Sequence, residues 1–149
     1  MQSNIELPKQ IFSVKEVTEK VMAKFADLPD NEKKKIETGD TYGLCGTFSL
    51  SLRKIIGAEL PVKTACSEHE DNNSHTFLLI PGNSSEEDII IDPTVNQFLK
   101  DYKGIFIGTR KGLRELVLNP KTKIINTKSK NNPQEAFERT WGSTSSISY

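Results

Sequence analysis

This sequence has few cysteines and histidines and no excess of either charge. Two cysteines, Cys45 and Cys66, and two histidines occur among 149 residues. Two cysteines are too few for a disulfide scaffold in a chain of this size, so both thiols are expected to be free in a reducing compartment. The 20 basic and 20 acidic residues balance, which leaves no basic surface for nucleic acid or an acidic membrane. We therefore expect neither of these partners.

Long apolar runs are also missing. No run approaches the roughly 20 residues of a membrane span, and the first residues lack the basic and apolar regions of a signal peptide. We expect a monomer that is cytoplasmic as synthesised. Delivery into another cell, without a cleavable signal peptide, is compatible with this expectation. The chain is 35% hydrophobic and has no repeat or linker, which predicts a single domain over residues 1–149. Its core is expected over about 13–127, and a polar tail over 128–149.

The hydrophobic pattern changes from helical spacing to strand spacing along the chain. Helices are predicted over residues 13–28, which begin with the capping box Ser13 to Glu16, over 31–37, and from Cys45 to Gly57. Residues 60–66 are interpreted as an edge strand, 67–74 as an acidic loop, and 75–80 and 88–91 as neighbouring antiparallel strands. Short strands are predicted at 105–107 and 123–126, and short helices at 111–118 and 134–140, with the last residues frayed. The predicted fold class is α+β, with the Cys45 helix packed on an antiparallel sheet.

Cys45 lies at the junction between a polar turn and a buried helix. Residues 37–43 contain two glycines and small polar side chains, and an apolar helical stripe follows from Leu44. Free N–H groups and the positive end of the helix dipole favour thiolate over thiol there, and they can lower a cysteine pKa from about 8.5. A thiolate is a nucleophile. The alternative is that this side chain only fills space beside Phe48.

His75 and Asp92 stand where a general base and its orienting acid would be needed. His75 begins an apolar strand directly after a loop, and Asp92 ends the next predicted strand just before Pro93. If the two strands pair around residues 81–87, His75 meets Asp92, and the carboxylate can hold the ring in one tautomer. The order Cys, His, Asp then matches a thiol acyl-transfer triad. The alternatives are an ordinary histidine at a strand edge and an aspartate that opens a turn.

Two rival interpretations use the remaining cysteine and histidine. His69 is a second candidate base, but it falls in the acidic loop with no predicted strand to hold it. Cys66 and His69 together with Cys45 and His75 could supply four metal ligands, although the spacing Cys-x-x-His lacks a paired knuckle. We favour neither interpretation, and we expect no metal and no cofactor.

Three stretches of the chain resemble a known superfamily. They are residues 43–49 (Gly-Leu-Cys-Gly-Thr-Phe-Ser), residues 74–80, and residues 89–98, which contain Asp-Pro-Thr-Val-Asn-Gln-Phe, followed by 105–109. Together they are similar to papain-fold, transglutaminase-like cysteine enzymes, and within them to small bacterial toxin and effector domains of the protein-glutamine deamidase type. The resemblance implies a papain-like fold in which Cys45 is the nucleophile, His75 the base and Asp92 the orienting acid. It also implies that Gln97 is buried and hydrogen-bonded, bracing its loop.

One position departs from the pattern of papain-type proteases. Those enzymes place an oxyanion-hole glutamine six residues before the nucleophile, where this chain has Gly39. The backbone N–H of Cys45 can supply one oxyanion donor, and an upstream backbone amide or the Thr41 side chain is the expected second donor. This departure weakens the protease interpretation and leaves acyl transfer untouched.

The expected function is therefore deamidation of a glutamine side chain on a partner protein. The thiolate attacks the carboxamide, ammonia leaves, and water hydrolyses the thioester to glutamate. Two alternatives use the same residues: transglutamination, in which a lysine amine takes the thioester, and peptide-bond hydrolysis, for which a chain of this length has little material to build an extended cleft. A third alternative, from another class, is a non-catalytic binding module with an unreactive Cys45.

Overall fold

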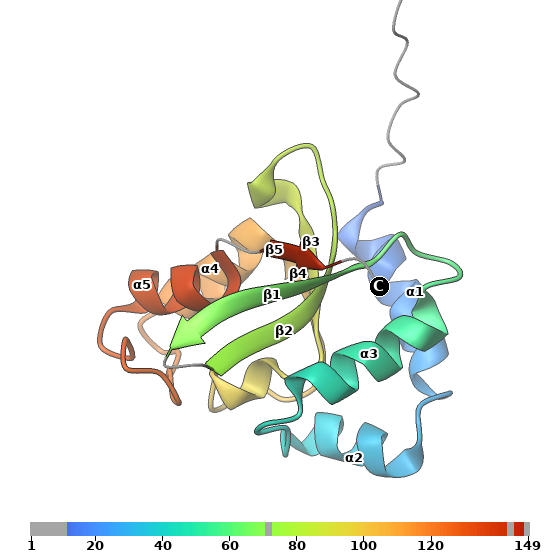
Figure 1. Ribbon diagram of the computed structural model, residues 1–149, viewed down its shortest axis with the longest axis horizontal. Helices are drawn as coiled ribbons and strands as arrows, with labels where there is room; N and C mark the ends of the chain where they lie inside the picture. Colours follow the sequence, from blue (N-terminus) through green and yellow to red (C-terminus); the bar gives the residue numbers. More distant parts are fainter. Residues whose placement is uncertain (1–11, 71–72, 143–144, 148–149) are drawn as a thin grey trace, which may run out of the picture.

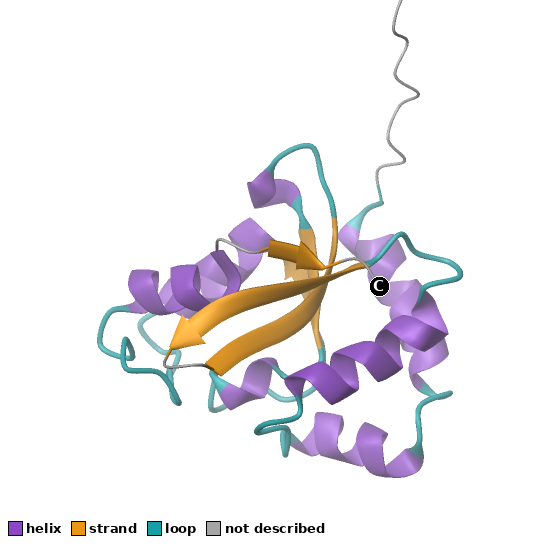
Figure 2. Cartoon of the chain, in the orientation of Figure 1, coloured by secondary structure: helices purple, strands orange, loops and turns teal. Residues whose placement is uncertain are grey.

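The computed structural model describes residues 12–70, 73–142 and 145–147 (Figure 1), with only the backbone of 68–70, 73 and 145–147. Within these ranges the chain is α+β, as predicted, with helices on both sides of an antiparallel sheet (Figure 2). The α-helices are α1 Val14–Phe25, α2 Asp30–Thr38, α3 Cys45–Ile56, α4 Arg110–Leu118 and α5 Pro133–Phe137. The strands are β1 Lys63–Glu70, β2 Asn73–Ile80, β3 Ile89–Asp92, β4 Phe106–Thr109 and β5 Ser145–Ile147. None of the described helices has the length and apolar character needed to cross a bilayer.

The strand order β4-β3-β2-β1-β5 corrects two of the predictions. The strand expected at 60–66 is not at an edge, because β1 pairs with β2 on one side and β5 on the other. The acidic loop expected at 67–74 is also wrong, since the β1–β2 pairing continues through Ser67 opposite His75 and Glu68 opposite Ser74. Strand pairing is made by main-chain hydrogen bonds, so polar side chains near a hairpin tip do not prevent it.

The C-terminal segment is more ordered than its composition predicts. Residues 145–147, expected to fray, pair with β1 as β5, while 148–149 lie outside the described residues. The helix predicted over 134–140 is α5 followed by a π-helical turn, η3 Glu138–Gly142. Residues 123–126 form no strand of their own and contribute a single bridge, from Leu99 to Ile124.

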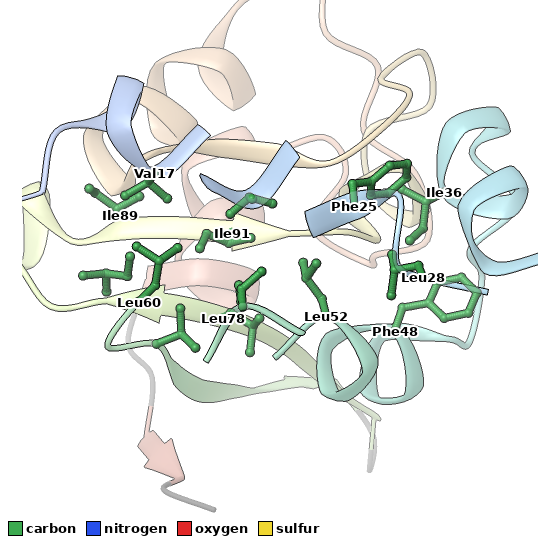
Figure 3. Packing of buried hydrophobic residues seen from close by; sticks show 14 residues of the cluster. Val17, Phe25, Leu28, Ile36, Phe48, Leu52, Leu60, Leu78, Ile89 and Ile91 are labelled. Carbon is green, nitrogen blue, oxygen red and sulfur yellow. The ribbon is translucent and has the colours of Figure 1, made fainter. Parts of the chain in front are cut away.

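The sheet is buried on both faces, which explains the continuous apolar runs of β2 and β3. Successive residues alternate between two clusters: Leu78 and Ile91 face one way, and Phe77 and Ile90 face the other. The first cluster joins the sheet to α1, α2 and α3 (Figure 3). The second joins it to α4 and α5 and includes Trp141. The core therefore extends beyond residue 127, where it was predicted to end. The two helical layers therefore approach the sheet from opposite sides.

Helix α3 packs on the sheet through one apolar face. Removing a buried side chain from that face should measurably lower the stability of the protein. Leu52 is 0% exposed, whereas Leu50 on the same helix is 42% exposed. Leu52→Ala should lower the free energy of unfolding by about 2–5 kcal/mol, because a fully buried side chain is lost and a cavity remains. Leu50→Ala, the matched control, should cost less than about 1 kcal/mol. Denaturant unfolding measures both, and equal losses would contradict this packing.

Candidate functional site

Helix α3 begins at Cys45 without the usual side-chain cap. Leu44 occupies the N-cap position and makes no side-chain capping hydrogen bond, so it leaves the N–H groups of the first turn to the site. The preceding turn reverses through Gly43, whose φ of +76° lies in the left-handed region that favours glycine. The start of α3, the start of β2 and the short helix η2 (Val95–Gln97) lie close together in Figure 1. This meeting point is the candidate site.

The first residues of β2 make hydrogen bonds to α3 where β3 does not reach them. β3 pairs with β2 only at Leu78, Leu79 and Ile80. The Thr76 carbonyl accepts a hydrogen bond from Ser49 Oγ (3.2 Å), and the Thr76 backbone helps to lower the pKa of Cys45. The Cys45 Sγ also lies 3.9 Å from the carbonyl oxygen of Ser74. These contacts dock the first turn of α3 beside His75.

The structure brings His75 and Asp92 together, although not by the predicted register. Leu78 pairs with Ile91, so continuing the ladder places Asp92 opposite Phe77 and diagonal to His75. The two side chains lie on the same face of the sheet, and His75 Nε2 is 2.6 Å from Asp92 Oδ2. The imidazole is fully buried, with the rings of Phe98 and Trp141 edge-on to it. Its other nitrogen, Nδ1, lies 3.3 Å from Gln97 Nε2.

Both carboxylate oxygens of Asp92 are surrounded by hydrogen-bond donors. Oδ2 accepts from His75 Nε2 and from the indole Nε1 of Trp141 (2.8 Å). Oδ1 accepts from the backbone N–H (2.9 Å) and the hydroxyl (3.3 Å) of Thr94. Burial raises the pKa of Asp92, but the charge of His75 and these hydrogen bonds outweigh burial and hold the pKa below its ordinary value. Asp92 is therefore a fixed anion that orients the imidazole.

The Gln97 side chain is buried and hydrogen-bonded, and it also reaches the reactive groups. It is 7% exposed. Its Oε1 accepts from the N–H of Gly43 (3.2 Å), and its Nε2 donates to Thr94 Oγ1 (3.0 Å) and lies 3.3 Å from His75 Nδ1. A hydrogen bond from Gln97 also helps to lower the pKa of Cys45. Gln97 thus links the turn before α3 to the histidine and the thiol.

Three of the groups expected to supply a second oxyanion donor already make hydrogen bonds within the protein. The hydroxyl of Thr41 donates to Asn96 Oδ1 (3.1 Å), and Thr41 is buried. The upstream N–H groups of Gly43 and Leu44 donate to Gln97 Oε1 and to the Thr41 carbonyl. These three groups therefore stabilise the turn itself, and a second donor at Thr41 or at an upstream amide stays a prediction.

The charges of the site favour a thiolate–imidazolium pair. Burial raises the pKa of the Cys45 thiol, but the hydrogen bond and the positive charge of His75 outweigh it and lower the pKa from 9.0 to about 7. Burial lowers the pKa of His75, but the charge of Asp92 and its hydrogen bond raise that pKa from 6.5 to about 9. Between about pH 7 and 9 the sulfur is therefore negative and the ring positive. A half-buried nucleophile with its proton already on a neighbouring base is chemically competent.

The two rival interpretations gain no support. His69 lies in β1, so the expectation that no strand holds it is wrong, and its side chain is outside the described atoms. Both cysteines are free, and Cys66 Sγ lies 3.3 Å from the Thr76 hydroxyl. Among the described residues, no group of three or more His, Cys, Asp or Glu could hold a metal ion. A cavity of about 290 Å³ lies between Leu99, Tyr102 and Leu116, and no triad residue lines it.

The sequence predicted that Trp141, with Phe137, anchors the C-terminal helix, but it did not reveal the contact of Trp141 with Asp92. Its indole N–H shares an oxygen of Asp92 with His75, yet it stands 49 residues after that aspartate and in a different element. No local pattern connects the two positions. The one available signal was that this is the single tryptophan of the chain, in a polar segment, where a buried aromatic residue is unexpected.

Comparison with known proteins adds nothing to this geometry. No family model matches the chain, and searches of curated proteins and of solved structures find no match either. The likeness to papain-fold enzymes stays a prediction. The case for a function rests on the arrangement of Cys45, His75, Asp92 and Gln97.

Proposed function

We propose that this protein is a cysteine-dependent amide hydrolase that deamidates a glutamine side chain on a partner protein. One observation carries the proposal: His75 Nε2 is 2.6 Å from the buried Asp92, and the imidazole lies close enough to Cys45 to lower the thiol pKa to about 7. This is the constellation that thiol acyl transfer needs. The α+β arrangement is compatible with the papain-like fold implied by the resemblance, and we propose that fold.

In the first half of the reaction, the Cys45 thiolate attacks the carboxamide carbon of the glutamine. A C–S bond forms, and the carbonyl oxygen becomes an oxyanion. When the C–N bond breaks, the proton on His75 Nδ1 goes to the departing nitrogen, so that neutral ammonia leaves and a thioester remains. Asp92 keeps the ring in place because it binds Nε2 and cannot rotate between its four donors.

The second half uses the same groups in reverse. Neutral His75 removes a proton from water, and the resulting hydroxide attacks the thioester carbon. The C–S bond breaks, the product is glutamate, and the sulfur leaves as a thiolate beside the imidazolium ring. The raised pKa of His75, about 9, and the lowered pKa of Cys45, about 7, favour this return to the ion pair.

Two N–H donors are available for the oxyanion. One is the backbone N–H of Cys45 at the uncapped start of α3. The other is the Gln97 carboxamide: when His75 Nδ1 carries a proton it cannot accept a hydrogen bond, so the second amide hydrogen of Gln97 is left for the sulfur or the oxyanion. Gln97 therefore takes the role that papain-type proteases give to a glutamine before the nucleophile.

Gln97→Met should lower kcat about 10²-fold, because an oxyanion donor is lost. Alkylation of Cys45 by iodoacetamide at pH 8 should change by less than about threefold, since that displacement forms no oxyanion. Gln134→Met, the same substitution at an exposed position, is the control. Equal losses in turnover and in alkylation would instead make Gln97 a residue that tunes the thiol.

Intact mass spectrometry tests the proposed reaction directly. Candidate partner proteins are incubated with the wild-type chain or with Cys45→Ala. Deamidation adds about 1 Da per glutamine, because NH₂ is exchanged for OH, and the gain should be absent with Cys45→Ala. Two fragments would mean a protease, and a summed mass would mean a transglutaminase. An unreactive Cys45 with no mass change would leave the non-catalytic module.

A further inference from the structure

The residue after Cys45 is a glycine, although the fold does not require glycine at that position. Gly46 lies in the first turn of α3, with no positive φ. A Cβ added there would have no heavy atom within 4 Å. Neither backbone geometry nor packing requires glycine, and glycine inside a helix is less stable than alanine. The open space over Gly46 is therefore a feature that the fold itself does not need.

The residue two positions before the nucleophile adds to the same opening. A Cβ on Gly43 would also have no heavy atom within 4 Å. Glycine therefore stands one position after Cys45 and two positions before it, with the half-buried Leu44 between Gly43 and the thiol. The main chain at these two glycines is bare.

The turn before Cys45 presents one large side chain to solvent. Tyr42 is 75% exposed. Its neighbours hold it in place, because Thr41 is buried and bonded to Asn96, and the N–H of Gly43 is bonded to Gln97. A fixed turn that holds an aromatic ring in water costs little entropy when the ring packs on a partner.

A glutamine substrate has to approach this bare surface closely. Three bonds separate its Cα from the carboxamide carbon, and that carbon must come within about 3.5 Å of the sulfur, so the substrate main chain lies within about 7 Å of Cys45 Sγ. A side chain at position 46 would occupy the open space that now lies over the first turn of α3. The missing Cβ of Gly46 leaves room for the substrate main chain.

We propose that Gly43 and Gly46 form the floor on which the glutamine-bearing main chain lies, and that Tyr42 packs against the side chains flanking that glutamine. This proposal rests on the proposed function and names its substrate class: a glutamine in an exposed, closely approachable segment of a protein. Gly46 and Tyr42 then determine specificity, while Cys45, His75 and Asp92 perform the chemistry.

The test uses the whole chain with Gly46→Ala and Gly46→Leu. Ala58→Leu is the control, since Ala58 is exposed just beyond the other end of α3. Alanine and leucine favour helices more than glycine does, so neither Gly46 variant should lose stability to denaturant. For the protein substrate, kcat/KM should fall about tenfold in Gly46→Ala and about 10²-fold in Gly46→Leu, because the substrate is held away from the sulfur. The control should stay within about twofold of wild type.

A second arm needs no substrate. Cys45 is alkylated with iodoacetamide and, separately, with a maleimide coupled to a small folded protein. The alkylation rate with the protein-coupled maleimide is divided by the rate with iodoacetamide. In Gly46→Leu this ratio should fall about tenfold, and in Ala58→Leu it should not change. If the ratio is lower but the wild-type chain deamidates no protein, the result would support open access to Cys45 over Gly46 and contradict the proposed deamidase function.

Two results would overturn the proposal. One is an unchanged ratio with an unchanged kcat/KM in Gly46→Leu. The other is equal slowing of both reagents, which would mean that the thiol chemistry changed and access did not. For the aromatic contact, Tyr42→Ala should raise KM about tenfold with kcat unchanged, and a wild-type KM would remove Tyr42 from the proposal.

Discussion

Asp92→Asn should lower turnover of the protein substrate on the order of 10⁴-fold, the largest loss expected from an isosteric change in this site. Asp92 accepts hydrogen bonds from His75, Trp141 and Thr94 and donates none. Asparagine offers one NH₂ group, which must face one of these donors. His75 also loses the charge that raises its pKa, and burial, which lowers that pKa, then prevails. At neutral pH the site should hold a neutral imidazole and a neutral thiol.

The measurement is turnover together with the pH profile of Cys45 alkylation. In the wild type, alkylation should follow an ionisation near pH 7, and in Asp92→Asn the midpoint should rise, because His75 no longer carries a positive charge there. Asp101→Asn, at an exposed position, is the control for the loss of one negative charge. Denaturant unfolding shows whether the variant is folded. A folded Asp92→Asn with less than about a tenfold loss would mean that Asp92 does not orient the base.

His75→Ala should reduce turnover by about 10²- to 10⁴-fold, because no group remains to protonate ammonia or to activate water. It should also move the midpoint of Cys45 alkylation from about pH 7 toward 9.0, since the hydrogen bond and charge of His75 are the largest effects that oppose burial. At pH 7 the thiolate fraction would fall about fiftyfold. Part of this is offset because a more basic thiolate is more nucleophilic, so the alkylation rate at pH 7 should fall about fivefold.

The matched control is His69→Ala, which removes the only other histidine and should leave both turnover and the alkylation profile unchanged. The pH midpoint is the decisive readout, because a change in packing alone would not move it. If the wild type already titrates near pH 9, and His75→Ala leaves that midpoint where it is, Cys45 and His75 are not a catalytic pair. The non-catalytic module would then be the better interpretation.

Local patterns predicted those parts of the fold that depend on near neighbours. The capping box at Ser13 and Glu16 marks the start of α1, and the apolar stripe after Leu44 marks α3, with Cys45 in its first turn. The apolar runs predicted β2 and β3 and their antiparallel pairing. These features are readable because helix caps and side-chain alternation act over a few residues.

Long-range pairing was not readable in the same way. The polar half of β1 has no strand signal, and it is a strand because β2 supplies its hydrogen bonds. β5 is likewise a short strand of three residues in a serine-rich tail, and it pairs with β1. The diagonal meeting of His75 and Asp92 depends on the register of that ladder, which no single strand specifies.

By itself, then, the sequence determined which residues are candidates for the site: a cysteine at a helix start, a histidine near a strand start and an aspartate at a strand end. The tertiary structure alone decided how these residues are supported. It brought Trp141 and Thr94 onto Asp92, turned Gln97 toward the thiol, and used the Thr41 hydroxyl within the turn. The physical reason is that identity and local conformation are written in neighbouring residues, whereas hydrogen-bond partners come from whichever segments the packed core brings together.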